Sequence, residues 1–221
     1  MDASAVTPGN LNCNASQIQL NGTGSSQGNN MAYTWTTTNG NFVSGQTTLT
    51  PLVDAAGDYA LLVTNNDNGC TSTAATTVVQ SAPVTAAVTA QTNVSCFGSS
   101  NGAASALASG GNGAYSYVWS NGVSAASIDN LPAGTYLVSV TDGESCSSSA
   151  TVEITQPEVL AANATATAQS ANGINDGTAT ANPSGGSGAY NYLWSNDSTT
   201  QVISGLAPGT YTVSVTDANG C

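Results

Sequence analysis

The chain has 221 residues, of which 12 are Asp or Glu and none is Lys, Arg or His, so its formal net charge is −12. Nucleic acids and anionic membrane surfaces are bound through Lys and Arg, and this composition excludes both as electrostatic partners. It also excludes a hydrolase triad with an imidazole or lysine base, a phosphate-binding loop with its lysine, and a histidine-containing zinc site.

The first unit of a repeated pattern lies in residues 1–81. Its sequence contains AYTW at 32–35 and GDYALLVTNNDNGC at 57–70. Both segments reappear in stricter form later in the chain, and a short Pro-containing joint follows at residues 80–83. We therefore predict a first domain over 1–81, with Trp35 and Tyr59 in its core.

The middle unit, residues 82–157, shows a periodicity of two rather than 3.6. Tyr136, Val138 and Val140 alternate with Leu137 and Ser139, as in a half-buried antiparallel strand. No stretch of the chain is typical of a helix. The pattern predicts strands at 84–90, 102–108, 114–120, 125–130, 134–141 and 150–155.

The third unit, residues 158–221, repeats the middle one. A shift of 75 residues lays 96–146 over 171–221 without a gap, and 25 of these 51 pairs are identical. The aromatic and glycine positions match, including Trp119 with Trp194 and Tyr136 with Tyr211. The third unit stops at Cys221, before the segment that forms the last predicted strand of the middle unit.

Six or seven short strands in about 75 residues, separated by Gly, Asn and Pro, favour a small immunoglobulin-like sandwich. We therefore predict an all-β protein of three tandem small immunoglobulin-like β-sandwich domains. Because the joints are too short to act as flexible tethers, the domains should form an elongated, stiff or semi-stiff rod. The expected core aromatic residues are Trp35, Tyr59, Trp119, Tyr136, Trp194 and Tyr211, and the tyrosines of the Gly-Thr-Tyr segments resemble tyrosine corners.

Two patterns of the middle and third units carry a resemblance to a known family. GAYSYVWSN at 113–121 and LPAGTYLVSVTDGESC at 131–146 resemble the SprB-type repeat of giant surface adhesins in gliding bacteria. In the first unit, IQLNGTGSSQGNN at 18–30 and the segment 47–79 resemble immunoglobulin-like or PKD-like modules of the same proteins. The resemblance implies a bacterial cell-surface or filamentous protein exported to the outside. No C-terminal sorting domain of such proteins appears in 1–221, so we expect either a longer natural chain or another route of anchoring.

Five cysteines lie near the ends of the predicted sandwiches. We expect disulfides between Cys13 and Cys70 and between Cys96 and Cys146, each worth roughly 4 kcal/mol in the chain-entropy model. The repeat alignment places Ala171 where a mate for Cys221 is needed. Cys221 is therefore expected as a free thiol or as one half of an intermolecular disulfide.

The third unit lacks its last strand, which would leave an unpaired sheet edge and an uncovered core. We expect this edge to be filled either by the continuing chain or by a strand from another molecule, in a homo-polymer or a longer adhesin. The N-terminal segment with Ala3, Ala5, Val6 and Thr7 faintly resembles the last strand of the middle unit. It is therefore a candidate donor strand for the next molecule.

Other candidate sites have simpler interpretations. Asp142 and Asp217 end equivalent strands, where Asx turns are more common than calcium sites. Asp197-Ser198-Thr199 resembles a short bacterial O-glycosylation signal, which makes Ser198 a candidate. We expect no enzyme activity, since the acids lie in turns of small sandwiches with little room for a cleft.

Together these features predict a non-enzymatic extracellular repeat protein without a cofactor, serving as a stalk or filament segment of a bacterial surface adhesin. One alternative is a self-assembling filament subunit completed by strand donation. A second is a carbohydrate-binding accessory module of a secreted protein, which would need an exposed row of aromatic side chains. We expect a surface glycan or substratum as an outside partner, no nucleic acid and no membrane insertion. A part in gliding motility rests on the family resemblance alone.

Overall fold

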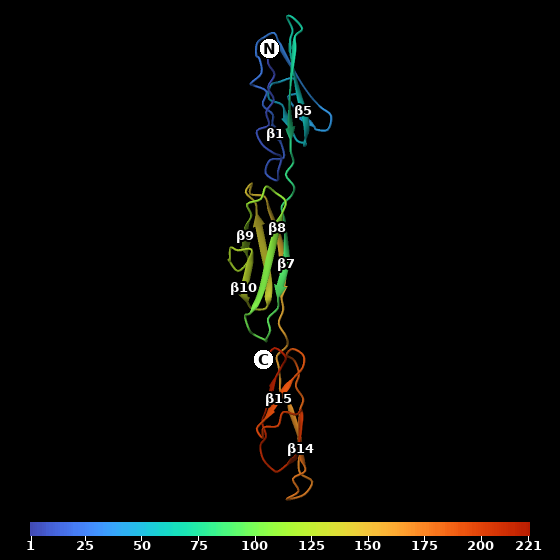
Figure 1. Cartoon of the computed structure of the whole chain (residues 1–221), viewed down its shortest axis with the longest axis vertical. Helices are drawn as coiled ribbons and strands as arrows, with labels where there is room; N and C mark the ends of the chain where they lie inside the picture. The colour runs from blue at the N-terminus through green and yellow to red at the C-terminus, as the bar shows by residue number, and fades with distance from the viewer. The chain divides into compact units, whose positions relative to one another are not determined.

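The computed structural model describes residues 1–221 and contains strands joined by turns and loops, without a helix (Figure 1). It therefore holds no helical segment of the length and apolarity that crossing a membrane requires. The strands form six small sheets, two in each repeat of the sequence. The all-β fold class is confirmed, and each repeat is an immunoglobulin-like sandwich of two sheets.

The first repeat packs a three-stranded sheet of order β1-β4-β3 against one of order β2-β5-β6. Side chains from both sheets, including Val53, Trp35 and Leu61, form one buried core. Pairing is antiparallel, and β5 pairs with β2 and β6 along its length. The strands are β1 (Ile18–Gln19), β2 (Met31–Thr37), β3 (Phe42–Ser44), β4 (Leu52–Val53), β5 (Gly57–Asn65) and β6 (Thr71–Val78).

The second repeat has sheets of order β10-β8-β7 and β12-β11-β9. The predicted strand 134–141 has the bounds of β11, and its side chains alternate between buried and exposed as expected. The last predicted strand begins three residues too late, because β12 starts directly after the turn at Cys146. The strands are β7 (Thr85–Thr92), β8 (Gly102–Ser109), β9 (Ser116–Trp119), β10 (Ser127–Leu131), β11 (Gly134–Thr141) and β12 (Ser147–Ile154).

The third repeat has a three-stranded sheet of order β13-β14-β16 and a two-stranded sheet of β15 and β17. Its buried core again takes residues from both sheets, among them Ala179, Ile203 and Trp194. The second sheet thus lacks the strand that β6 and β12 provide in the other repeats. The strands are β13 (Ala164–Thr167), β14 (Gly177–Ala181), β15 (Asn191–Trp194), β16 (Val202–Leu206) and β17 (Val213–Thr216).

Equivalent aromatic residues make equivalent hydrogen bonds in all three repeats. The hydroxyls of Tyr59, Tyr136 and Tyr211 each donate to the carbonyl four residues upstream, at 2.7, 3.0 and 3.2 Å. This is the tyrosine-corner role predicted for Tyr136 and Tyr211, and Tyr59 shares it. The three tryptophans are buried, and each indole Nε1 donates to a backbone carbonyl at 2.9 Å. Tyr211 differs from the other expected core tyrosines, since it packs against its core but is only half-buried.

The chain divides into two compact units. Unit 1 comprises Met1–Ala87, Ala108–Val118 and Ser139–Ser149, and unit 2 comprises Val88–Leu107, Trp119–Val138 and Ala150–Cys221. The second repeat contributes to both units. The predicted domain boundaries after residues 81 and 157, and the predicted rod, stay predictions.

Candidate functional site

The disulfides join different repeats, and the predicted pairing within each repeat is wrong. Cys13 bonds Cys146 in unit 1, and Cys96 bonds Cys221 in unit 2, with Cα–Cα distances of 5.7 Å in both bridges. Cys70, expected to pair with Cys13, is an exposed free thiol. The expectation of a free or intermolecular Cys221 is also wrong, since its mate lies in the preceding repeat.

A side-chain amide lies beside each bridge and reinforces it. Asn14 Nδ2 donates to the carbonyl of Glu144 at 2.5 Å next to the Cys13–Cys146 bridge. Asn219 Nδ2 donates to the carbonyl of Ser95 at 2.9 Å next to the Cys96–Cys221 bridge. These bonds each span more than 120 residues of sequence, and nothing in the local sequence pattern indicates them.

The two buried carboxylates of the repeats cap the hairpin turns that carry the bridging cysteines. Asp142 accepts hydrogen bonds from the backbone N–H groups of Glu144 and Cys146, both at 2.9 Å. Asp217 accepts them from Asn219 and Cys221 at 2.9 and 3.0 Å. The predicted Asx-turn role is therefore what the structure shows, and it fixes the backbone at each cysteine.

These amide donors favour the ionised form of the Asp217 carboxyl. The N–H of Cys221 lowers the pKa of Asp217 most, burial opposes this by raising it, and the N–H groups of Ser187, Asn219 and Gly220 lower it further. The net effect is a pKa below the usual range of an aspartic acid. No group of three or more metal-ligating side chains is present in the structure.

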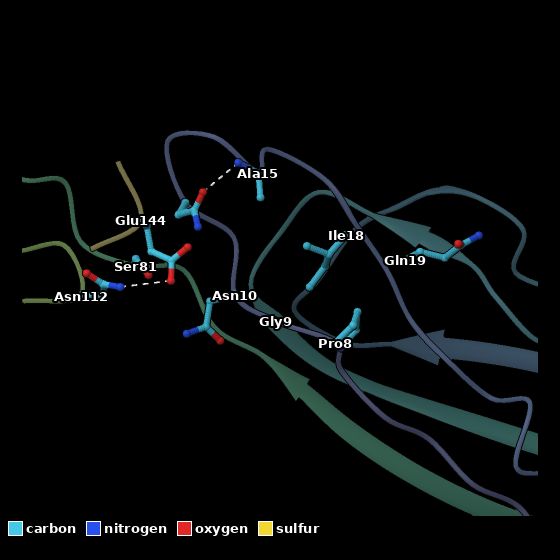
Figure 2. A pocket seen from close by; sticks show the side chains of 10 residues that line it. Pro8, Gly9, Asn10, Ala15, Ile18, Gln19, Ser81, Asn112 and Glu144 are labelled. Carbon is cyan, nitrogen blue, oxygen red and sulfur yellow. Dashed lines mark hydrogen bonds between the residues drawn. The ribbon is translucent and has the colours of Figure 1, made fainter. Parts of the chain in front are cut away.

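A pocket in unit 1 lies beside the turn of Glu144 and has a volume of about 520 Å³. Figure 2 shows the Glu144 carboxylate and the Asn112 amide at its edge, joined by a hydrogen bond of 3.1 Å. Asn10 lies near this pair, and Ile18 lines the wall farther along the pocket. The Glu144 carboxylate is exposed and makes no contact with a second acid, so the pocket shows neither a carboxylate pair nor a metal site.

The aromatic side chains form no exposed row. The three tryptophans are at most 2% exposed, and every tyrosine is buried or half-buried. Phe97 alone among the aromatic residues is well exposed, at 54%. Stacking on a sugar needs an open ring face, and the tryptophans and tyrosines present no row of such faces.

An open groove lies in the third repeat, where β6 and β12 lie in the others. Its volume is about 740 Å³, and its lining includes Trp194, Leu206 and Tyr211. Val138 and Val140 of the second repeat are fully buried, whereas their equivalents Val213 and Val215 are only half-buried. The core of the third repeat is therefore covered less completely than that of the second, although Trp194 and Ile203 remain buried.

Two further details distinguish this groove from the equivalent region of the second repeat. In the second repeat, a Cβ on Gly102 would lie 2.6 Å from the Ile154 side chain of β12. At the equivalent Gly177, the nearest side-chain atom is Leu206 Cβ, 3.5 Å from the position of a Cβ. The side-chain oxygen of Gln169, which lines the groove, is buried and has no hydrogen-bond partner.

The N-terminal segment lies in its own repeat, so its predicted role as donor strand is wrong. Ala3 and Ala5 pack against the first core. Val6 pairs with Asn21, and the Thr7 hydroxyl lies 2.7 Å from that of Thr76. The segment serves as an edge of the first sandwich because its alternating small side chains fit that core.

Ser198 lies in the turn after β15. It is half-buried, and its hydroxyl lies 3.0 Å from the Thr200 hydroxyl. Its glycosylation stays a prediction.

The family comparison matches the SprB repeat at residues 88–124 and 172–199. These two stretches hold the Tyr-x-Tyr-x-Trp segments of the second and third repeats. Among curated proteins, no sequence matches the chain.

Three solved structures are similar to the chain. The three N-terminal domains of the highly immunogenic outer capsid protein (Hoc) of bacteriophage RB49 align over 92% of this chain and 78% of their own, with 16% identity and a TM-score of 0.47. A C-terminal fragment of intimin, solved with the intimin-binding domain of its translocated receptor, aligns over 72% and 66%, with 16% identity and a TM-score of 0.42. An amphioxus IgVJ-C2 molecule aligns over 64% and 97%, with 14% identity and a TM-score of 0.36.

Proposed function

We propose that this chain, a surface adhesin-type repeat protein by its SprB repeats, is a non-enzymatic extracellular spacer segment of a bacterial adhesin. The observation that carries the proposal is the pair of disulfides between consecutive repeats. Disulfides persist in oxidising compartments outside the cytosol, which supports an exported protein. A spacer needs no site of its own, and it must resist extension when a distant binding part is pulled.

The bridges suit that mechanical role. A bridge inside one sandwich would only limit how far that sandwich unfolds, whereas a bridge from one repeat to the next bypasses the joint between them. Load then passes between consecutive repeats through the disulfides, and only the residues on the shortest covalent path carry it. The sparsely charged surface without Lys or Arg supports the same role, because it offers no attraction to anionic polymers and no trypsin site.

The extracellular part of the proposal predicts that antibodies against the chain label intact, unpermeabilised cells that produce it. Brief treatment of those cells with an external protease other than trypsin should remove the label. A cytosolic protein labelled in parallel is the control for leakage. Labelling only after permeabilisation would contradict the proposal.

The open groove of the third repeat favours a second function, completion by an added β-strand. The occupant should resemble β12, since that strand covers the same position in the second repeat and buries Val152 and Ile154. We propose that this strand comes from the continuing chain or from another molecule, in a longer adhesin or a homo-polymer. With a neighbour as donor, the segment would be a filament subunit rather than a spacer.

A synthetic peptide with the sequence of residues 147–157 should bind the chain and change Trp194 fluorescence. Replacing the residues that correspond to Val152 and Ile154 by Ser should weaken binding more than about 100-fold, since burial of each side chain is worth about 1.5–3 kcal/mol. The proposed strand position would be contradicted if both peptides bound equally well, or if neither peptide bound.

A further inference from the structure

The cysteines fall into two sets of structurally equivalent positions, of which the first holds Cys13 and Cys96, here called the first-position cysteines. Each of the two cysteines follows, by two residues, a residue whose backbone N–H donates a hydrogen bond to the carbonyl just after the repeat's last strand. Leu11 donates to the carbonyl of Val79 and Val94 to that of Thr155, both at 2.9 Å. The repeat alignment places Ala171 at this position in the third repeat.

The second set holds the hairpin cysteines, Cys70, Cys146 and Cys221. In each repeat the hairpin cysteine's carbonyl accepts a backbone hydrogen bond from the residue that closes the turn. The donors are Asn65, Asp142 and Asp217, at 2.9, 2.9 and 3.1 Å. The three cysteines thus occupy the same place in three copies of one turn, which in the first two repeats joins the strands of a hairpin.

Both disulfides follow one rule, in which a first-position cysteine bonds the hairpin cysteine of the next repeat. Cys13 of the first repeat bonds Cys146 of the second, and Cys96 of the second bonds Cys221 of the third. By this rule the partner of Cys70 is a first-position cysteine in a repeat that precedes the first. Cys70 is exposed, whereas the bonded Cys146 is buried, and the Cys70 N–H is held by Asn68 Oδ1 at 3.0 Å.

We propose that Cys70 is a covalent attachment site for another repeat module that carries a first-position cysteine. The partner is not the third repeat of an identical copy, because that repeat has Ala171 instead of the cysteine. In the oxidation that attaches the module, the thiol of Cys70 and the thiol of the partner cysteine lose two protons and two electrons, and one S–S bond forms. The acceptor is a disulfide oxidant of the exported environment, which is reduced to two thiols.

The inference names a partner for the proposed spacer and rests on that function for its biological role. The attachment at Cys70 and the spacer function can be disproved separately. An unattached Cys70 would remove the partner module while leaving the two observed bridges, and therefore the load-bearing role, unchanged.

The rule can be tested with the full chain by restoring the missing cysteine. In a glutathione redox buffer, A171C should form disulfide-linked oligomers on a non-reducing gel, and peptide mapping should join position 171 to Cys70. The wild type and the double variant A171C/C70S should form no such series. T199C carries an exposed thiol elsewhere on the third repeat and should crosslink to Cys70 at least about tenfold less.

Equal crosslinking of A171C and T199C, or an A171C product joined only through Cys70 of two copies, would overturn the proposal. The exported protein gives a second test when its thiols are blocked before extraction. There, Cys70 should be bonded to a cysteine from a different sequence. A blocked, free Cys70 or a bond between two copies of Cys70 would overturn it.

Discussion

Pulled by its two ends, the oxidised chain should extend by less than a third of the length it reaches after reduction. The shortest covalent path runs from residue 1 to Cys13, across to Cys146, back to Cys96, and across to Cys221. This path holds about 62 residues and spans about 220 Å, whereas all residues in line span about 770 Å at about 3.5 Å each. Single-molecule force spectroscopy with and without a reductant measures both lengths.

Variants separate the two bridges in this measurement. C96S leaves only the first bridge, so the path lengthens to about 87 residues, or about 300 Å. C70S should leave the oxidised length unchanged, because that thiol is in neither bridge. Equal extension of the oxidised and reduced chains would contradict the load-bearing role.

Replacing Trp119 by Ala should destabilise the second repeat by about 3–5 kcal/mol. The side chain is 1% exposed, and its Nε1 donates to the Ala125 carbonyl at 2.9 Å, so the change leaves both a cavity and an unpaired acceptor. The loss should appear in calorimetry as a lower transition temperature for one of the repeats. Glycan binding, had Trp119 served it, would instead be lost without a change in stability.

Val118 provides the matched control for Trp119. It precedes Trp119 in β9, and its side chain points to the opposite, exposed face. V118A should change the free energy of unfolding by no more than about 0.5 kcal/mol. A small effect of W119A on stability would show that the indole is not a core residue.

The strands could be predicted from the sequence where alternation is strong and the ends carry glycine or proline. Tyr136, Val138 and Val140 alternate with outward residues, and the bounds predicted for β11 are correct. The start of β12 is less regular in sequence, because Ser147 to Ser149 carry no apolar alternation. Those residues are strand because they pair with β11, which the local pattern does not reveal.

The disulfide pairing could not be decided from the sequence. When each of the two first-position cysteines pairs with one of the three hairpin cysteines, one hairpin cysteine stays unpaired. Pairing within each repeat leaves Cys221, and pairing between consecutive repeats leaves Cys70. The choice depends on which hairpin approaches which strand end in space, and the repeat alignment holds no information about that.

The third repeat shows the same division between local and spatial information. Its missing strand was predictable by alignment with β12, and the half-buried Val213 and Val215 agree. The position of the N-terminal segment in its own repeat was not predictable, because a short run of Ala, Val and Thr fits any sandwich edge. The unpaired Gln169 oxygen and the amide contacts of Asn14 and Asn219 have no signature in sequence.

Disulfide mapping of the purified chain tests the account most directly. Without Lys or Arg, the digestion requires chymotrypsin rather than trypsin, under conditions that prevent disulfide exchange. We expect linked peptides that join Cys13 to Cys146 and Cys96 to Cys221, with Cys70 recovered as a free thiol. Peptides that join Cys13 to Cys70 or Cys96 to Cys146 would show bridges inside single repeats and would contradict the proposed covalent path through the chain.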